Sequence, residues 1–170
     1  IQSQYFKNEI RVNTPLMGKH NILNILAAFS SVYKLNGDMT FFLKSLKSFK
    51  NESQRLEFQP WINQSNLIND SYNANPDSVK AAIDVLYQMR GRKIMILGDM
   101  KELGRYRKKV HKEIGEYAKL KKLDLFLGFG DLARHSVRSF GSSGIFFDSK
   151  IALTEFLKSE ISKKDYVLLK

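Results

Sequence analysis

The sequence predicts an α/β fold: a Rossmann-like, open and mostly parallel sheet with flanking helices. From residue 67 onward, short apolar runs alternate with segments of helical length and helical periodicity. One of these runs, residues 93–97, is continuously apolar after its first residue, as is typical of a strand buried on both faces of a parallel sheet. Repeated β–α units at this spacing indicate a doubly wound sheet.

The first part of the chain predicts a different, helical region. Residues 1–16 alternate apolar and polar positions and are interpreted as a strand or an extended segment. Apolar residues at helical spacing follow between Gly18 and Gly37, and a second helix is expected at about 41–49. The polar stretch 50–54 then predicts a domain boundary. The expected domains are residues 1–50 and residues 51–170.

The second domain is expected to begin with a short strand and to alternate regularly after it. The strands are expected at residues 67–68, 93–97, 123–127, 145–147 and 166–169, and the helices at residues 77–89, 108–120, 132–140 and 151–161. Ligands of such sheets bind outside the carboxyl ends of the strands. Polar and glycine residues after the first three strands are therefore candidate site residues: Asp70, Gly98, Asp99, Gly128 and Gly130.

Composition limits the possible partners. The formal net charge is +11, which could indicate a nucleic-acid partner, but the lysines are scattered and carry no interleaved aromatic stacking motif. Affinity for anionic small molecules is the preferred interpretation. The chain has no cysteine, which excludes disulfides and thiolate metal sites. No apolar run approaches the roughly 18 residues that a membrane span needs. A cytoplasmic location is expected.

Three motifs point to one family. They are GKHNILNILAA at residues 18–28, DSYNANPDS at residues 70–78 and LGDMKELG at residues 97–104. In this order and spacing they resemble the Mur ligases, and the second and third resemble the family member that adds D-Ala-D-Ala. The resemblance implies that residues 1–50 are the end of a central ATP-binding domain. It implies that residues 51–170 are the family's Rossmann-like C-terminal domain.

The resemblance also implies a reaction. ATP would phosphorylate the terminal carboxylate of UDP-MurNAc-tripeptide, and the amine of D-Ala-D-Ala would attack the acyl phosphate, as a step of peptidoglycan synthesis. ATP and Mg²⁺ are the implied cofactors. The sequence contains no Gly-x-x-x-x-Gly-Lys-Ser/Thr loop, so this loop and most Mg²⁺ ligands are expected upstream, and the chain alone is expected to be inactive. The alternative is a free-standing Rossmann-like nucleotide-binding module without catalysis.

Three candidate ATP-binding residues lie in the first motif. His20 and Asn24 are four residues apart on the expected helix and therefore share a face, with Asn21 alongside. The resemblance implies that this face contacts adenine. The alternative is that His20 and Asn21 only cap the helix behind Gly18.

Two more candidates for ATP binding lie near the boundary and the first strand end. The resemblance implies that Arg55 reaches the nucleotide and that Asp70 lies near its ribose or phosphates. A guanidinium suits phosphate or ring stacking through its planar fork. Gln54 stands where the family usually has glycine, so the turn could differ. The alternatives are an Arg55–Glu57 ion pair and a capping role for Asp70.

The candidates for dipeptide binding are Asn73, Asn75 and Asp99. They place hydrogen-bond acceptors at strand ends, where the ammonium of D-Ala-D-Ala could be held. Asp99 could instead cap the turn that follows it. His111, on the next expected helix, is interpreted as structural, and no residue of this chain is assigned to a metal.

Overall fold

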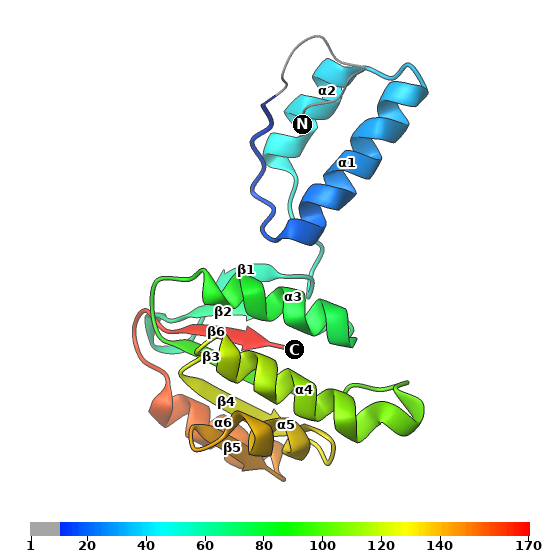
Figure 1. The fold of residues 1–170 in the computed structure, drawn as a ribbon. Helices are drawn as coiled ribbons and strands as arrows, with labels where there is room; N and C mark the ends of the chain where they lie inside the picture. The colour runs from blue at the N-terminus through cyan, green and yellow to red at the C-terminus, as the bar shows by residue number, and fades with distance from the viewer. Residues whose placement is uncertain (1–10) are drawn as a thin grey trace. The chain divides into compact units, whose positions relative to one another are not determined.

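The computed structural model describes residues 11–170 (Figure 1). They divide into two compact units, with the division between Asn51 and Glu52. Part of the predicted N-terminal strand falls on residues 1–10 and lies outside the described residues. Residues 11–18 form neither helix nor strand. No helix between residues 11 and 170 is long and apolar enough to cross a membrane.

The first unit contains two helices, α1 (Lys19–Lys34) and α2 (Met39–Ser48), both close to their predicted positions. The Asp38 carboxylate begins α2 by accepting hydrogen bonds from two backbone N–H groups of its first turn, at 2.8 and 3.0 Å. The rings of Phe29 and Phe42 meet edge to face at 6.0 Å between centroids. The two helices therefore pack through an aromatic contact.

The second unit is built on a six-stranded sheet with the order β1-β2-β6-β3-β4-β5. The strands are β1 (Glu57–Pro60), β2 (Asn66–Asn69), β3 (Lys93–Leu97), β4 (Leu125–Phe129), β5 (Gly144–Phe147) and β6 (Tyr166–Leu169). All neighbouring pairs are parallel except β1 with β2, so the predicted mostly parallel sheet is confirmed. The sequence did not predict β1, which is a four-residue edge strand that ends in a proline.

Four helices connect the parallel strands: α3 (Pro76–Tyr87), α4 (Arg107–Leu120), α5 (Ala133–Phe140) and α6 (Lys150–Glu160). Three-residue 3₁₀ turns lie at Ile62–Gln64 and Gly104–Tyr106. Helices α3, α4 and α5 cover one face of the sheet and α6 lies on the other (Figure 1). This distribution follows from right-handed crossovers, because the chain moves one way from β2 to β5 and then returns to β6.

The central strand β3 shows why the core is stable. Ile94 and Ile96 point to the face of α6, where they pack with Val167 and Leu157. The alternate residues of β3 are also buried and point to the opposite face. Each fully buried aliphatic side chain contributes about 1.5–3 kcal/mol. The prediction of a strand buried on both faces is confirmed.

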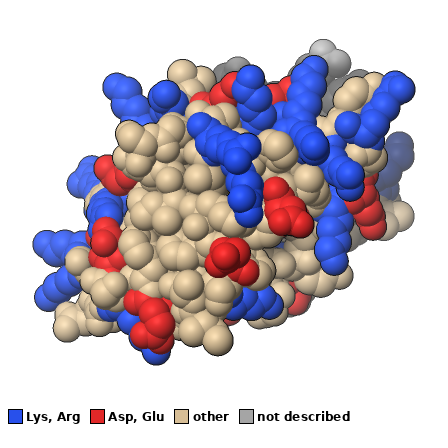
Figure 2. Space-filling model, turned by 90° about the horizontal axis from the view of Figure 1, so that it is seen from below, with Lys and Arg blue, Asp and Glu red and all other residues tan. Residues whose placement is uncertain are grey.

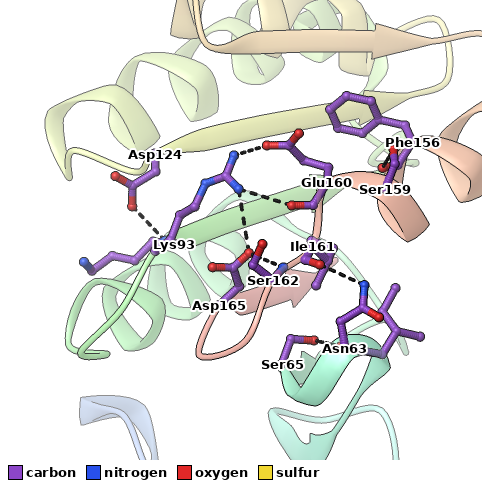
Figure 3. Close-up of polar contacts among 12 residues, drawn as sticks. Asn63, Ser65, Lys93, Asp124, Phe156, Ser159, Glu160, Ile161, Ser162 and Asp165 are labelled. Carbon is purple, nitrogen blue, oxygen red and sulfur yellow. Dashed lines mark hydrogen bonds and ion pairs between the residues drawn. The ribbon is translucent and has the colours of Figure 1, made fainter.

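Side-chain contacts tie together the amino ends of the strands, shown in Figure 3. The Arg92 guanidinium, just before β3, forms an ion pair with Glu160 at the end of α6. It also lies 3.7 Å from the Asp165 carboxylate, which is almost fully buried before β6 and accepts a hydrogen bond from the Ser162 N–H at 2.9 Å. Arg92 therefore links three elements at this edge.

Two further contacts complete this amino edge. The Asp124 carboxylate, just before β4, accepts a hydrogen bond from the Lys93 N–H at 2.7 Å. The Asn63 side-chain amide donates to the backbone carbonyl oxygen of Ile161 at 2.9 Å (Figure 3). It also donates to the Lys158 carbonyl oxygen at 3.2 Å. These contacts join residues distant in sequence, and they satisfy backbone groups that the strand and helix ends would otherwise leave unpaired.

Candidate functional site

Asp70 lies directly after β2, at the carboxyl edge of the sheet, and both of its carboxylate oxygens are engaged. Oδ1 accepts a hydrogen bond from the Leu56 N–H at 3.0 Å. Oδ2 accepts one from the Lys170 ammonium at 2.5 Å, and the Lys170 side chain is only 2% exposed. Sequence reasoning missed Lys170 as a partner because the two residues are 100 positions apart.

Arg55 directly precedes Leu56, whose N–H contacts Asp70. The Arg55 guanidinium lies over an aromatic ring. Its Cζ is 4.1 Å from the ring centroid of Tyr72, within the range of a cation–π contact. The Glu57 carboxylate accepts hydrogen bonds from Ser53 Oγ and the Gln54 N–H, at 3.2 and 3.0 Å. The alternative Arg55–Glu57 ion pair is not formed, and both Arg55 and Tyr72 are exposed.

The backbone on either side of Arg55 is left-handed. Gln54 has φ +60° and Leu56 has φ +48°, a region that favours glycine. The carbonyl of Gln54 also accepts a hydrogen bond from the Tyr72 N–H at 3.2 Å. Gln54 thus adopts a conformation that glycine, the residue usual here in the resembled family, would take without strain.

The two asparagines of the second motif have different surroundings. Asn75 is the N-cap of α3: its side chain accepts a hydrogen bond from the Ser78 N–H at 2.9 Å, and Ser78 Oγ accepts one from the Asn75 N–H at 3.1 Å. This reciprocal capping box begins the helix, with Pro76 in its first turn. Asn73 is exposed, and its Oδ1 contacts the next backbone N–H at 2.8 Å. Asn73 is therefore the freer of the two.

Asp99, directly after β3 and Gly98, caps a helix that is distant in sequence. Its Oδ1 accepts hydrogen bonds from the N–H groups of Leu132 and Ala133, at 2.9 and 2.8 Å, at the start of α5. The alternative of a cap on its own following turn is therefore wrong. Gly130 has φ +105°, and a Cβ there would lie 2.5 Å from Asp99 Oδ1, so this position needs glycine. Gly128 was expected after the third strand but lies within β4.

His111 is fully buried on α4 and holds the loop that follows β3. Its Nε2 accepts a hydrogen bond from the Met100 N–H at 3.1 Å, and its Nδ1 lies 2.8 Å from the Arg107 carbonyl oxygen. Burial lowers the pKa of His111 below its ordinary value of 6.5. The geometry fits a neutral imidazole with its proton on Nδ1, consistent with the predicted structural role.

The first unit carries the other three predicted ATP-binding residues near the start of α1. The Asn21 side-chain amide donates to the Met17 carbonyl at 2.8 Å, and the Asn24 amide lies 3.5 Å from Asn21 Oδ1. His20 Nδ1 is buried and has no hydrogen-bond partner among the described residues. A buried nitrogen without a partner is uncommon in folded proteins, so the described contacts leave this position unsatisfied.

Neither a metal centre nor a basic stripe emerges from the described residues. Between residues 11 and 170, no group of three or more His, Asp or Glu side chains could hold a metal ion. Figure 2 shows one face of the molecule, where lysine and arginine side chains surround an uncharged area and alternate with aspartate and glutamate. This face offers no continuous basic path of the kind that tracks a nucleic-acid backbone.

A family model described as "Mur ligase, glutamate ligase domain" matches residues 54–170. The chain belongs to the Mur ligase family. Solved Mur ligases share its fold: MurF of Acinetobacter baumannii has a TM-score of 0.83 at 28% identity and covers 94% of this chain. MurF of Thermotoga maritima in complex with ADP has a TM-score of 0.77 at 27% identity, over 91% of this chain.

Curated Mur ligases resemble the chain over most of its length. The UDP-N-acetylmuramoyl-tripeptide–D-alanyl-D-alanine ligase of Haemophilus influenzae is 35% identical over 89% of this chain. Its counterpart in Bacillus subtilis is 32% identical over 92%. The chain spans 33% and 36% of the length of these two relatives. The D-glutamate ligase of Cytophaga hutchinsonii, at 39% identity, matches only 49% of this chain.

Proposed function

We propose that this Mur ligase chain is part of an ATP-dependent enzyme that adds D-Ala-D-Ala to UDP-MurNAc-tripeptide in peptidoglycan synthesis, through an acyl phosphate. The observation that carries the proposal is the match to UDP-N-acetylmuramoyl-tripeptide–D-alanyl-D-alanine ligases over about nine-tenths of the chain. The match to a D-glutamate ligase covers only half of it. A cytoplasmic location and small-molecule partners follow from this proposal, and no observation favours a free-standing binding module.

Each unit, taken by itself, offers side chains suited to a nucleotide. Arg55 presents an exposed guanidinium beside the exposed ring of Tyr72 at the end of β2, a surface suited to phosphate or to a base. In the first unit, the side chains of Asn21 and Asn24 offer hydrogen bonds to adenine. His20 Nδ1 has no hydrogen-bond partner among residues 11–170 and would offer another once the atom is exposed. We therefore propose that Arg55, His20, Asn21 and Asn24 contact ATP. Asp70 was predicted with them, but its oxygens are already engaged.

The dipeptide is proposed to lie beside the ends of β2 and β3. Asp99 uses Oδ1 for the cap of α5, which leaves Oδ2 for an ammonium. Asn73 is exposed and can turn its amide to the ligand, whereas Asn75 is proposed to contribute mainly by fixing the start of α3. Positioning of the amine and the acyl phosphate would supply much of the rate enhancement.

Magnesium is proposed as a cofactor of the complete enzyme. Phosphoryl transfer from ATP places charge on the transferred oxygens, which a bound divalent cation neutralises. Residues 11–170 contain no suitable cluster of ligands, and we assign no step of this chain to the metal.

The proposal is tested with the complete ligase of which we propose this chain is a part. Purified enzyme with ATP, UDP-MurNAc-tripeptide and labelled D-Ala-D-Ala should form one amide for each ADP released. The isolated 170-residue chain should release no ADP above background. Transfer of L-Ala or D-Glu in preference to D-Ala-D-Ala would contradict the proposed substrate.

A further inference from the structure

We propose that Asp70 is a positioning residue: together with the buried Lys170 it holds the segment Gln54–Leu56, and thereby holds Arg55 over the loop that follows β2. The kinetic test of this inference rests on the proposed function. The structural test does not.

The Asp70 carboxylate occupies a fixed place in the sheet. The Asp70 N–H donates a hydrogen bond to the Leu169 carbonyl at 2.9 Å, so its backbone continues the ladder between β2 and β6. From there one oxygen accepts from the Leu56 N–H at 3.0 Å and the other from Lys170 at 2.5 Å. The carboxylate therefore joins the segment before β1 to the ends of two strands.

Lys170 fixes the orientation of this carboxylate. Its backbone N–H donates to the Ile96 carbonyl and its carbonyl accepts from the Gly98 N–H, each at 2.9 Å, so the residue is held at the carboxyl end of the central strands. A buried ammonium costs several kcal/mol unless it is paired. Asp70 is its ion-pair partner among the described residues. The pair is thus maintained whenever these strand ends are folded.

The segment around Arg55 needs such a restraint. Left-handed backbone costs a residue other than glycine about 1–2 kcal/mol, and here it occurs on both sides of Arg55. Strained backbone persists only where its surroundings fix it. Leu56 restrains this segment through its buried side chain and through its N–H on Asp70. Backbone groups add the Gln54 carbonyl on the Tyr72 N–H, the Gln54 N–H on the Glu57 carboxylate and the Arg55 N–H on the Glu52 carbonyl. Loss of the Asp70 acceptor should let the segment relax and carry Arg55 off Tyr72.

Direct contact of the Asp70 carboxylate with ATP is the competing role, and a matched pair of variants separates the two. Asp70→Asn with Lys170→Met keeps an oxygen that accepts from Leu56, whereas Asp70→Ala with Lys170→Met does not. Neither variant retains a carboxylate or leaves the ammonium buried without a partner. Both should fold, because removing the two charges together leaves no unpaired ion in the interior.

The structural test is hydrogen–deuterium exchange of the peptide that contains residues 54–56 in the complete ligase. We expect exchange roughly tenfold faster in the alanine double variant than in the asparagine double variant, since one hydrogen bond is lost. Peptides from β3 and β4 should be unchanged. Equal exchange in the two variants would overturn the inference, whether or not the protein is a ligase.

The kinetic test compares kcat/KM for ATP in the same pair. The kcat/KM of the asparagine double variant should be at least about ten times that of the alanine double variant. Adding Arg55→Ala to the alanine double variant should lower its kcat/KM by no more than about twofold further. An equal, large loss in both variants, with Arg55→Ala additive in each, would assign direct nucleotide contact to Asp70 and overturn the positioning role. No amide formation by the wild-type enzyme would instead contradict the proposed function, and the exchange test would then decide the inference.

Discussion

The two edges of the sheet use polar residues in different ways. At the amino edge, Arg92 and the carboxylates near it contact one another or backbone groups, and they hold strands and α6 together (Figure 3). At the carboxyl edge, Arg55, Tyr72 and Asn73 are exposed, and the backbone around Arg55 is left-handed. The exposed polar groups and the strained backbone of the carboxyl edge support the proposal that ligands bind there, whereas the polar groups of the amino edge satisfy one another.

The largest effect is expected at the carboxyl edge, from Arg55→Ala in the complete ligase. Loss of one preorganised cationic contact should weaken transition-state stabilisation by roughly 2–4 kcal/mol, measured as kcat/KM for ATP. The melting temperature should change little, since the exposed Arg55 contributes little to stability. Arg138→Ala, an exposed position on α5, serves as the control and should retain activity. Wild-type kcat/KM in Arg55→Ala would remove this residue from the ATP site.

The amino edge should respond in the opposite way to Arg92→Ala. The change leaves the nearly buried Asp165 without its guanidinium, which should lower the free energy of unfolding by about 1–3 kcal/mol. Urea denaturation measures this loss, and kcat/KM for ATP should stay within about twofold in the folded enzyme. Arg90→Ala, an exposed neighbour, should be close to neutral. A loss of activity without a loss of stability would show that the amino edge is functional.

Asp99 has a structural contact, the cap of α5, and a proposed ligand contact, and two variants separate these roles. Asp99→Asn keeps an oxygen for the cap of α5 but removes the charge proposed for the ammonium, so KM for D-Ala-D-Ala should rise far more than KM for ATP. Asp99→Ala should in addition lower stability by about 1 kcal/mol. If Asp99→Asn leaves both KM values unchanged, Asp99 only caps the helix.

The smallest effect is expected from His111, as its contribution to the pH dependence of the free energy of unfolding. Burial lowers its pKa in the folded state, so between that value and 6.5 the unfolded chain binds more protons. Stability should therefore be fully present above pH 6.5 and decrease as the pH falls through the folded-state pKa. In His111→Gln, whose amide oxygen can replace Nε2 as acceptor, the melting temperature should fall less between pH 7 and pH 5. An equal decrease in both proteins would assign the pH dependence to other groups.

Local patterns were sufficient to predict much of the fold. The continuous apolar runs gave β3 and β6 at their observed bounds, since burial on both faces leaves no polar position in a strand. The Asn75–Ser78 spacing also contains the signal for its capping box, although the sequence reasoning assigned Asn75 to the ligand. The edge strand β1 was missed because it is short and half exposed.

Long-range polar contacts could not be predicted from the sequence. Asp70 was chosen from its place at a strand end, but the pattern does not indicate which side chain its oxygens meet. Asp99 was predicted to contact the dipeptide, with a cap on its own following turn as the alternative. It caps α5, 33 residues away, because β3 and β4 are adjacent in the sheet. The left-handed conformation of Gln54 could not be predicted either, because glutamine normally avoids this conformation and its presence in the sequence does not indicate it.

Ligand binding at the carboxyl edge of the sheet can be tested by hydrogen–deuterium exchange of the complete ligase. Exchange is compared without ligand and with a non-hydrolysable ATP analogue plus D-Ala-D-Ala. We expect slower exchange in peptides covering residues 54–56, 70–75 and 98–102, and no change in those covering residues 90–93 and 160–165. Protection confined to the second group, or none in the first, would contradict ligand binding at this edge.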